Sequence, residues 1–124
     1  MSRAPFVVEE GAVEVESGED RGVIWRTLTS ADRTPTSELT SGVCEIAPGC
    51  ELALHRHPPL ELYYFLEGTG VVTLGASDHA VRAGTTISIP GDTPHRIRNT
   101  GTATLKLFYV FPTASFTEVE YTNL

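Results

Sequence analysis

The sequence predicts an all-β fold, mainly because turn residues occur at short intervals along the chain. The chain has 124 residues, among which eleven glycines and eight prolines separate short runs of β-branched and aromatic residues. Such turn signals recur roughly every eight to twelve residues, a spacing typical of a sandwich or barrel. No apolar pattern with a helical period extends beyond about two turns. We therefore expect about ten short strands arranged as a sandwich or barrel.

The expected strands lie between turn residues that would end each of them. Turns are expected at 48–49, 58–59, 67–70, 75–78, 90–91 and 99–101, and Pro112 ends the longest run. The segment 29–37 is polar and contains Pro35, so it should be a loop. Residues 1–20 are acidic and could form either an outer strand or a loose arm. The expected strands are 23–28, 39–46, 51–57, 60–66, 71–74, 79–82, 86–89, 95–98, 103–111 and 116–121.

Length, composition and charge narrow the class of protein. The length suits one domain spanning 1–124, and the hydrophobic content of 40% is that of a globular protein. The net charge is −7, and no cluster of basic residues is visible, which argues against a nucleic-acid partner. The same negative charge gives no electrostatic attraction to anionic membranes. No apolar run reaches the roughly 18 residues that span a bilayer, and no signal peptide is visible. We therefore expect a cytoplasmic protein in which Cys44 and Cys50 are reduced thiols.

Two histidines on one expected strand are the first sign of a metal site. Residues i and i+2 of a strand point to the same face, so His55 and His57 should point the same way. Imidazole is the commonest metal-binding side chain in proteins. Glu61 opens the next strand beyond the bend at Pro58–Pro59, and His95 begins a later one.

The four side chains His55, His57, Glu61 and His95 would supply three nitrogens and one carboxylate oxygen to an ion. This set suits one divalent transition metal: Fe, Mn, Co, Ni or Zn. Four protein ligands leave one or two positions open for water or substrate in a five- or six-coordinate ion. If Glu61 points at the metal, the pleat places Tyr63 on the same side.

The spacing of these residues resembles that of the cupin superfamily. Gly49, His55, His57, Glu61 and Gly68 are separated by five, one, three and six residues, which matches the first cupin motif. In the second motif, five residues separate Gly84 from Pro90, and three separate His95 from Asn99. The family usually has glycine two residues after this proline, where the present chain has Asp92. The resemblance implies a cupin jelly-roll β-barrel of two antiparallel sheets, with 41–111 as its core and a metal in its mouth. Because cupins are often homodimers, it also implies a homodimer.

A narrower resemblance concerns the cupin lyases that cleave dimethylsulfoniopropionate into dimethyl sulfide and acrylate. It is carried by segments 22–25, 45–49, 55–63, 111–113 and 116–121, of which the last lies outside the general cupin motifs. The resemblance implies a small carboxylate substrate held by the metal. It assigns Tyr63 as the base that removes the proton α to the carboxylate. It assigns Tyr121 to orienting the substrate or sharing that proton.

Other readings of these residues stay open at this stage. Tyr63 could be a core aromatic, and Tyr121 could close the barrel end. Trp25, the only tryptophan, is expected to fill the core. The same four ligands would also serve an iron dioxygenase or a sugar isomerase, and a cupin without activity could be a small-molecule-binding module.

Overall fold

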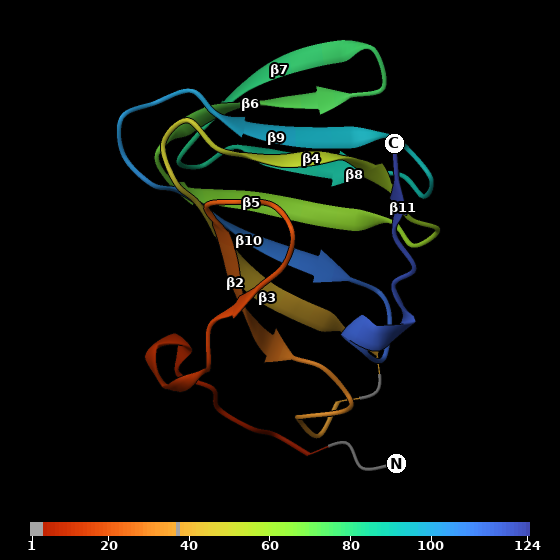
Figure 1. The fold of residues 1–124 in the computed structure, drawn as a ribbon. Coiled ribbons are helices and arrows are strands. Elements are labelled where there is room, and N and C mark those ends of the chain that lie inside the picture. Colours follow the sequence, from red (N-terminus) through yellow and green to blue (C-terminus); the bar gives the residue numbers. More distant parts are fainter. Residues whose placement is uncertain (1–3, 37) are drawn as a thin grey trace.

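Two antiparallel β-sheets face each other in this chain, as the computed structural model of residues 4–36 and 38–124 shows (Figure 1). Two short 3-10 turns, η1 (Glu10–Ala12) and η2 (Phe116–Glu118), accompany the strands in the described residues. The all-β prediction is therefore confirmed. The strands are β1 (Glu16–Ser17), β2 (Val23–Thr29), β3 (Thr40–Ile46), β4 (Glu51–Arg56), β5 (Glu61–Glu67), β6 (Thr69–Leu74), β7 (Ser77–Arg82), β8 (Thr86–Ile89), β9 (His95–Asn99), β10 (Leu105–Phe111) and β11 (Thr122–Asn123).

The sheet order shows that strands far apart in the sequence lie side by side. One sheet has the order β1-β2-β3-β10-β5-β8, and the other has the order β11-β4-β9-β6-β7. The late strand β10 lies between β3 and β5, with Leu107 opposite Cys44 on one side and Phe65 on the other. This crossing of early and late strands between two layers is the expected jelly-roll arrangement.

The core fills the space between the sheets because the strands alternate. On β10, Leu105, Leu107, Tyr109 and Phe111 point inward and are buried, while the residues between them are half-buried. The turn after β9 is fixed from inside by Asn99. Its Nδ2 atom donates to the carbonyl oxygens of Ile46 and Ala103, both at 2.8 Å, and its Oδ1 atom accepts from the Gly101 amide at 2.9 Å.

The C-terminal segment differs from its prediction. Residues 116–121 do not form a strand, because η2 occupies the first half and only β11 pairs with β4. The Ser115 side chain accepts a hydrogen bond from the Thr117 amide and begins the turn. Phe116 then packs with ring centroids 6.5 Å from Trp25 and 6.2 Å from Phe111. The aromatic residue at the start of 116–121 therefore packs on the core as part of a turn.

The N-terminal segment is partly an outer strand and partly an arm outside the sheets, the two arrangements that the sequence left open. Residues 1–3 lie outside the described residues. Glu16 and Ser17 form a short edge strand opposite Trp25 and Ile24 of β2, whereas the residues around η1 follow no sheet. The Glu10 carboxylate pairs with Lys106 of β10 at 2.9 Å, which holds this arm against the outside of the six-stranded sheet.

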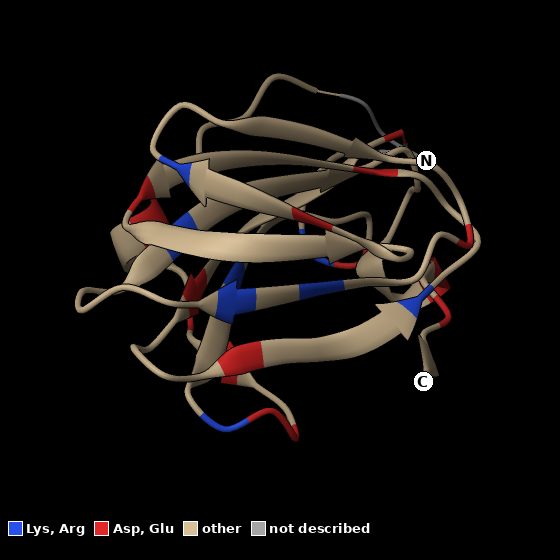
Figure 2. Cartoon of the chain, turned by 90° about the horizontal axis from the view of Figure 1, so that it is seen from above, with Lys and Arg blue, Asp and Glu red and all other residues tan. Residues whose placement is uncertain are grey.

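Charged side chains are interspersed along the strands (Figure 2). Arg98 on β9 pairs with Asp78 on β7 at 3.2 Å, and Arg26 on β2 pairs with Glu45 on β3 at 3.2 Å. Both pairs are half exposed, so each contributes little to stability. None of the described helices has the length and apolar content needed to cross a bilayer.

Candidate metal centre

Three histidines from the five-stranded sheet and its margin converge on one point. His55 lies near the end of β4, His57 follows that strand, and His95 begins β9 directly opposite His55. One ring nitrogen of each histidine lies within 4.8 Å of those of the other two, and all three side chains are buried. Such a spacing of three nitrogens could hold a metal ion.

The orientation of each ring is fixed by its second nitrogen. The Nδ1 atoms of His55, His57 and His95 lie 2.7, 2.9 and 2.8 Å from the carbonyl oxygens of residues 53, 59 and 93. Because a carbonyl only accepts, Nδ1 carries a proton in each ring, and Nε2 is the nitrogen that could ligate an ion. The Nε2 atom of His95 is buried and has no hydrogen-bond partner in the described part of the chain. This arrangement is typical of histidines that ligate a metal.

Glu61 reaches the same point from the opposite sheet. It is the first residue of β5, it is buried, and its Oε1 atom lies 3.1 Å from the Nε2 of His57 and 3.5 Å from that of His95. A buried carboxylate is stable only when it is paired with a cation or with hydrogen-bond donors. A divalent cation among these groups would compensate the carboxylate charge without protonating an imidazole. The donors therefore fit the predicted set of three nitrogens and one oxygen.

The histidines differ in how their surroundings affect protonation in the metal-free chain. Burial and, next, the neighbouring His95 lower the pKa of His55 to about 4. Burial also acts to lower the pKa of His57, but the hydrogen bond and charge of Glu61 outweigh it, and the pKa of His57 is raised. At neutral pH, His55 is thus a neutral imidazole, the form that binds metal.

The turn before His95 shows how this chain accommodates Asp92 at the position where cupins usually have glycine. Asp92 has a φ of 58°, the left-handed conformation that the usual glycine at this position would adopt, and aspartate tolerates it better than most residues. Its amide donates to the His57 carbonyl at 2.7 Å. A side chain on Gly91 would collide with the Pro58 carbonyl, so the glycine is needed one position earlier. The turn thus joins the segments that carry His57 and His95.

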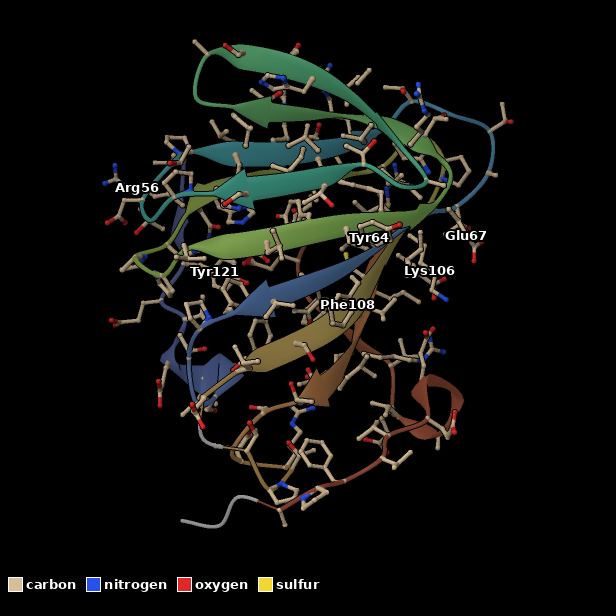
Figure 3. All side chains as sticks on the ribbon, turned by 180° about the vertical axis from the view of Figure 1, so that it is seen from behind. Arg56, Tyr64, Glu67, Lys106, Phe108 and Tyr121 are labelled. Atoms are coloured by element: carbon tan, nitrogen blue, oxygen red, sulfur yellow. The ribbon has the colours of Figure 1, made fainter. Side chains whose placement is uncertain are left out.

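Both predicted tyrosines lie beside the histidine group and line one cavity of about 680 Å³, together with His55 and Glu61. Tyr63 is buried on the inner face of β5, with its ring centroid 6.2 Å from that of His95. Tyr121 comes from the C-terminal segment, and its ring centroid lies 5.2 Å from both His55 and His57. Figure 3 shows Tyr121 near one end of the barrel, far from Glu67 at the other end of β5. Tyr64 faces outward, as the pleat predicts.

The metal-free surroundings of Tyr63 favour a protonated phenol. Burial, and next the charge of Glu61, raise the pKa of Tyr63 well above its usual value. Tyr63 is therefore a hydrogen-bond donor in the metal-free chain.

Three further aromatic residues line the cavity, although the sequence did not predict them there. Trp25, Tyr109 and Phe116 line it at the side of β2, β10 and η2. Tyr109 could have been found from the sequence, because alternation along 103–111 places it on the same face as Leu107. The position of Phe116 depends on η2, which no pattern in the sequence predicted. Trp25 is half-buried and packs against the core, but it also forms part of the cavity wall.

A cupin domain family model matches residues 42–111, more than half of the chain. The chain belongs to the cupin family. It is also 37% identical to the dimethylsulfoniopropionate lyase DddW of Ruegeria pomeroyi, over 98% of this cupin and 81% of that protein. The narrower resemblance seen in the sequence is thus confirmed.

Solved structures with a similar fold support the same family. A predicted oxalate decarboxylase of Thermotoga maritima superimposes with a TM-score of 0.77 at 26% identity, covering 87% of this cupin and 99% of that chain. The polyketide cyclase RemF of Streptomyces resistomycificus superimposes with a TM-score of 0.83, covering 98% of this cupin and 86% of that chain. At 20% identity, the second comparison supports the fold alone.

Proposed function

We propose that this cupin is a metal-dependent carbon–sulfur lyase that cleaves dimethylsulfoniopropionate, or a related β-substituted carboxylate. The observation that carries the proposal is the position of Tyr63 and Tyr121. These tyrosines come from different parts of the chain and line one cavity, Tyr63 next to His95 and Tyr121 next to His55 and His57. The 37% identity to a dimethylsulfoniopropionate lyase supports the choice of substrate.

The proposed metal ligands are His55, His57, Glu61 and His95, and the ion would be one of Fe, Mn, Ni, Co or Zn. A bound divalent ion would act as a Lewis acid that stabilises the charge developing on the substrate carboxylate. Tyr63 is buried, and a buried environment strengthens this electrostatic effect.

The reaction proposed for this cavity is a β-elimination. Tyr63 accepts the proton from the carbon α to the carboxylate, through its phenolic oxygen. The electron pair of that C–H bond forms the new double bond between the α and β carbons. The bond between the β carbon and sulfur breaks, and its electron pair leaves on sulfur as neutral dimethyl sulfide. The remaining product is acrylate.

Tyr63 must be a phenolate to accept this proton. In the metal-free chain, burial and the charge of Glu61 act against that form. Compensation of the Glu61 charge by a bound cation is therefore a requirement of the proposal. Tyr121 contacts the rings of His55 and His57 from the cavity entrance, and we assign it to orienting the substrate or sharing the transferred proton.

Substitution of Tyr63 by phenylalanine tests the assigned base. The ring and its packing are kept and only the hydroxyl is lost, so Tyr63→Phe should bind metal normally and lose about 10²–10⁴-fold in kcat. The assay is headspace detection of dimethyl sulfide from metal-loaded protein. Tyr64→Phe is the matched control, because the same change on the outer face of β5 should leave kcat unchanged. Full turnover by metal-loaded Tyr63→Phe would contradict the role of this tyrosine.

The size of the cavity favours a second candidate. A volume of about 680 Å³ is within the range of pockets that hold considerably larger ligands than a five-carbon zwitterion. The second candidate is another metal-dependent reaction, a dioxygenation or an isomerisation, on a larger small molecule. Oxygen consumption by the iron-loaded protein separates a dioxygenation from the lyase reaction, which proceeds without oxygen. Release of dimethyl sulfide separates the lyase reaction from an isomerisation.

A further inference from the structure

Residues 112–124 lead from one sheet to the other at the end of the barrel that carries the histidines (Figure 1). They follow Phe111, the last residue of β10 in the six-stranded sheet, and include β11, which pairs with β4 of the five-stranded sheet. In the register of that pair, Asn123 lies opposite His55. We call residues 112–124 the C-terminal strap; it places Tyr121 beside the histidines.

The strap is weakly attached where it meets the five-stranded sheet. β11 has two residues, both exposed, and the Leu124 amide adds one hydrogen bond of 3.1 Å to the Leu54 carbonyl. Strands are usually three residues or longer, so this attachment fixes the strap only loosely. The position of Tyr121 therefore depends on how the strap is held at its other end.

A cluster of hydroxyl groups around one carboxylate holds that other end. Ser30 is fully buried, and Ser115 is 7% exposed. The Ser30 hydroxyl donates to the Asp32 carboxylate and accepts from the Phe116 amide at 3.0 Å. The Ser115 hydroxyl donates to the same carboxylate oxygen at 3.3 Å and accepts from the Thr117 amide at 3.2 Å. We call Ser30, Asp32 and Ser115 the serine–aspartate cluster.

The loop that supplies half of this cluster is itself held in place. The Ala31 amide donates to the Ala114 carbonyl at 2.7 Å, which joins the backbones of the loop and the strap. On the other side of the loop, the Arg33 guanidinium donates two hydrogen bonds to the Glu16 carboxylate of β1, at 2.8 and 3.1 Å. The serine–aspartate cluster thus attaches the strap to a fixed support.

Phe116 connects the cluster to Tyr121. Its amide is held by Ser30, and its ring lies edge-on to the ring of Tyr121, with 6.3 Å between the centroids. The Tyr121 ring in turn lies 5.2 Å from the rings of His55 and His57. These contacts are continuous from the loop to the candidate metal ligands, so a shift of Phe116 would displace Tyr121.

We propose that Ser30, Asp32 and Ser115 are positioning residues, which hold Tyr121 beside the three-histidine group by fixing the start of the C-terminal strap. The part that Tyr121 then plays in the lyase reaction rests on the proposed function. Asp32 is the central residue of the cluster, because one of its oxygens accepts from both serine hydroxyls. Hydrogen bonds to an ionised carboxylate are stronger than those between neutral groups.

Amide hydrogen exchange of the full chain, measured by mass spectrometry on peptides from the strap, tests the attachment. Asp32→Ala removes the shared acceptor, so these peptides should exchange at least about tenfold faster. Asp78→Ala is the matched control, because Asp78 also accepts from a hydroxyl, that of Thr73 at 2.6 Å, but in the hairpin of β6 and β7.

Two further variants separate the hydrogen bonds from other effects of the substitution. Asp32→Asn keeps an acceptor oxygen but loses the ion pair with Arg33, and it should restore most of the protection. Ser115→Ala removes one donor to Asp32 and makes the same test if Asp32→Ala does not fold, as judged by circular dichroism. Strap peptides that exchange in Asp32→Ala and Ser115→Ala as they do in Asp78→Ala would overturn the proposal.

Headspace detection of dimethyl sulfide from metal-loaded protein tests the link to Tyr121. Asp32→Ala should lower kcat about 10–100-fold with unchanged affinity for the metal, because a displaced group no longer acts at the reacting atoms. In a Tyr121→Phe background, the same substitution should change kcat less than about twofold, since the positioned hydroxyl is already absent. An equal loss in both backgrounds would mean that the cluster acts on the fold in general, and would refute the positioning role.

The two measurements distinguish a failure of this proposal from a failure of the proposed function. Faster exchange of the strap in Asp32→Ala, with no dimethyl sulfide from the wild type, would support the positioning of Tyr121 and contradict the lyase reaction. An active wild type whose kcat is unchanged by Asp32→Ala would contradict the positioning role and leave the lyase reaction in place.

Discussion

Replacement of His55 by asparagine should flatten the acid sensitivity of the metal-free protein. Burial and the neighbouring His95 lower the pKa of His55 from 6.5 to about 4. Between these two pH values, the unfolded chain binds a proton at His55 that the folded chain does not bind. The free energy of unfolding therefore decreases as the pH falls from 6.5 to 4, and no further below that.

The size of this effect follows from the two pKa values. A difference of 2.5 between 6.5 and about 4, at 1.36 kcal/mol per pKa unit, corresponds to about 3 kcal/mol of stability lost on acidification. The raised pKa of His57 acts in the opposite direction, because the folded chain then holds its proton more tightly than the unfolded chain. His57 is present in both wild type and His55→Asn, so the difference between their pH profiles isolates His55.

Urea denaturation in the presence of a chelator, at pH values from 7 to 4, measures these profiles. The asparagine Nδ2 atom can keep the hydrogen bond to the Ala53 carbonyl, so the variant should fold. We expect its free energy of unfolding to fall by about 3 kcal/mol less than that of the wild type over this range. Parallel profiles for the two proteins would refute the assignment of a neutral, buried His55.

Two further predictions concern stability. Asn99→Ala removes three hydrogen bonds, one of them to the carbonyl of the buried Ile46, so the free energy of unfolding should fall by about 2–4 kcal/mol, with an unchanged m-value in urea. Mn(II) or Fe(II) at about 100 times its Kd should stabilise the chain by about 2.7 kcal/mol, seen as a rise in Tm. His95→Ala should abolish this rise and the exposed His79→Ala should not; equal rises in both variants would contradict a site at His95.

The elements that the sequence predicted well are those whose side chains alternate between core and solvent. The strands around His55, Glu61 and His95 were predicted within about two residues, because turn residues end each of them. The i, i+2 relation placed His55 and His57 together, and the pleat placed Tyr63 beside Glu61, since both arguments need only local geometry. The roles of these residues in metal binding and catalysis stay predictions.

The features that the sequence did not predict depend on contacts between distant segments. Residues 116–121 were expected to form a strand, but Phe116 packs on Trp25 as part of a turn, a contact between distant segments that local sequence does not show. The cavity wall at Tyr109 results from the pairing of β10 between β3 and β5. Tyr64 lies on the outer face of β5, as alternation along the strand implies, and 45% of it is exposed.

Glu61 and the histidines come from opposite sheets, and this has a mechanical consequence for the barrel. At their end of the barrel, β4 ends after Arg56, whereas β5 and β9 begin at Glu61 and His95. An ion bound by His55 and His95 from one layer and by Glu61 from the other would act as a cross-link at this open end. The distance between the layers would then be held at this end by coordination in addition to packing, so that loading with metal and rigidity of the site change together.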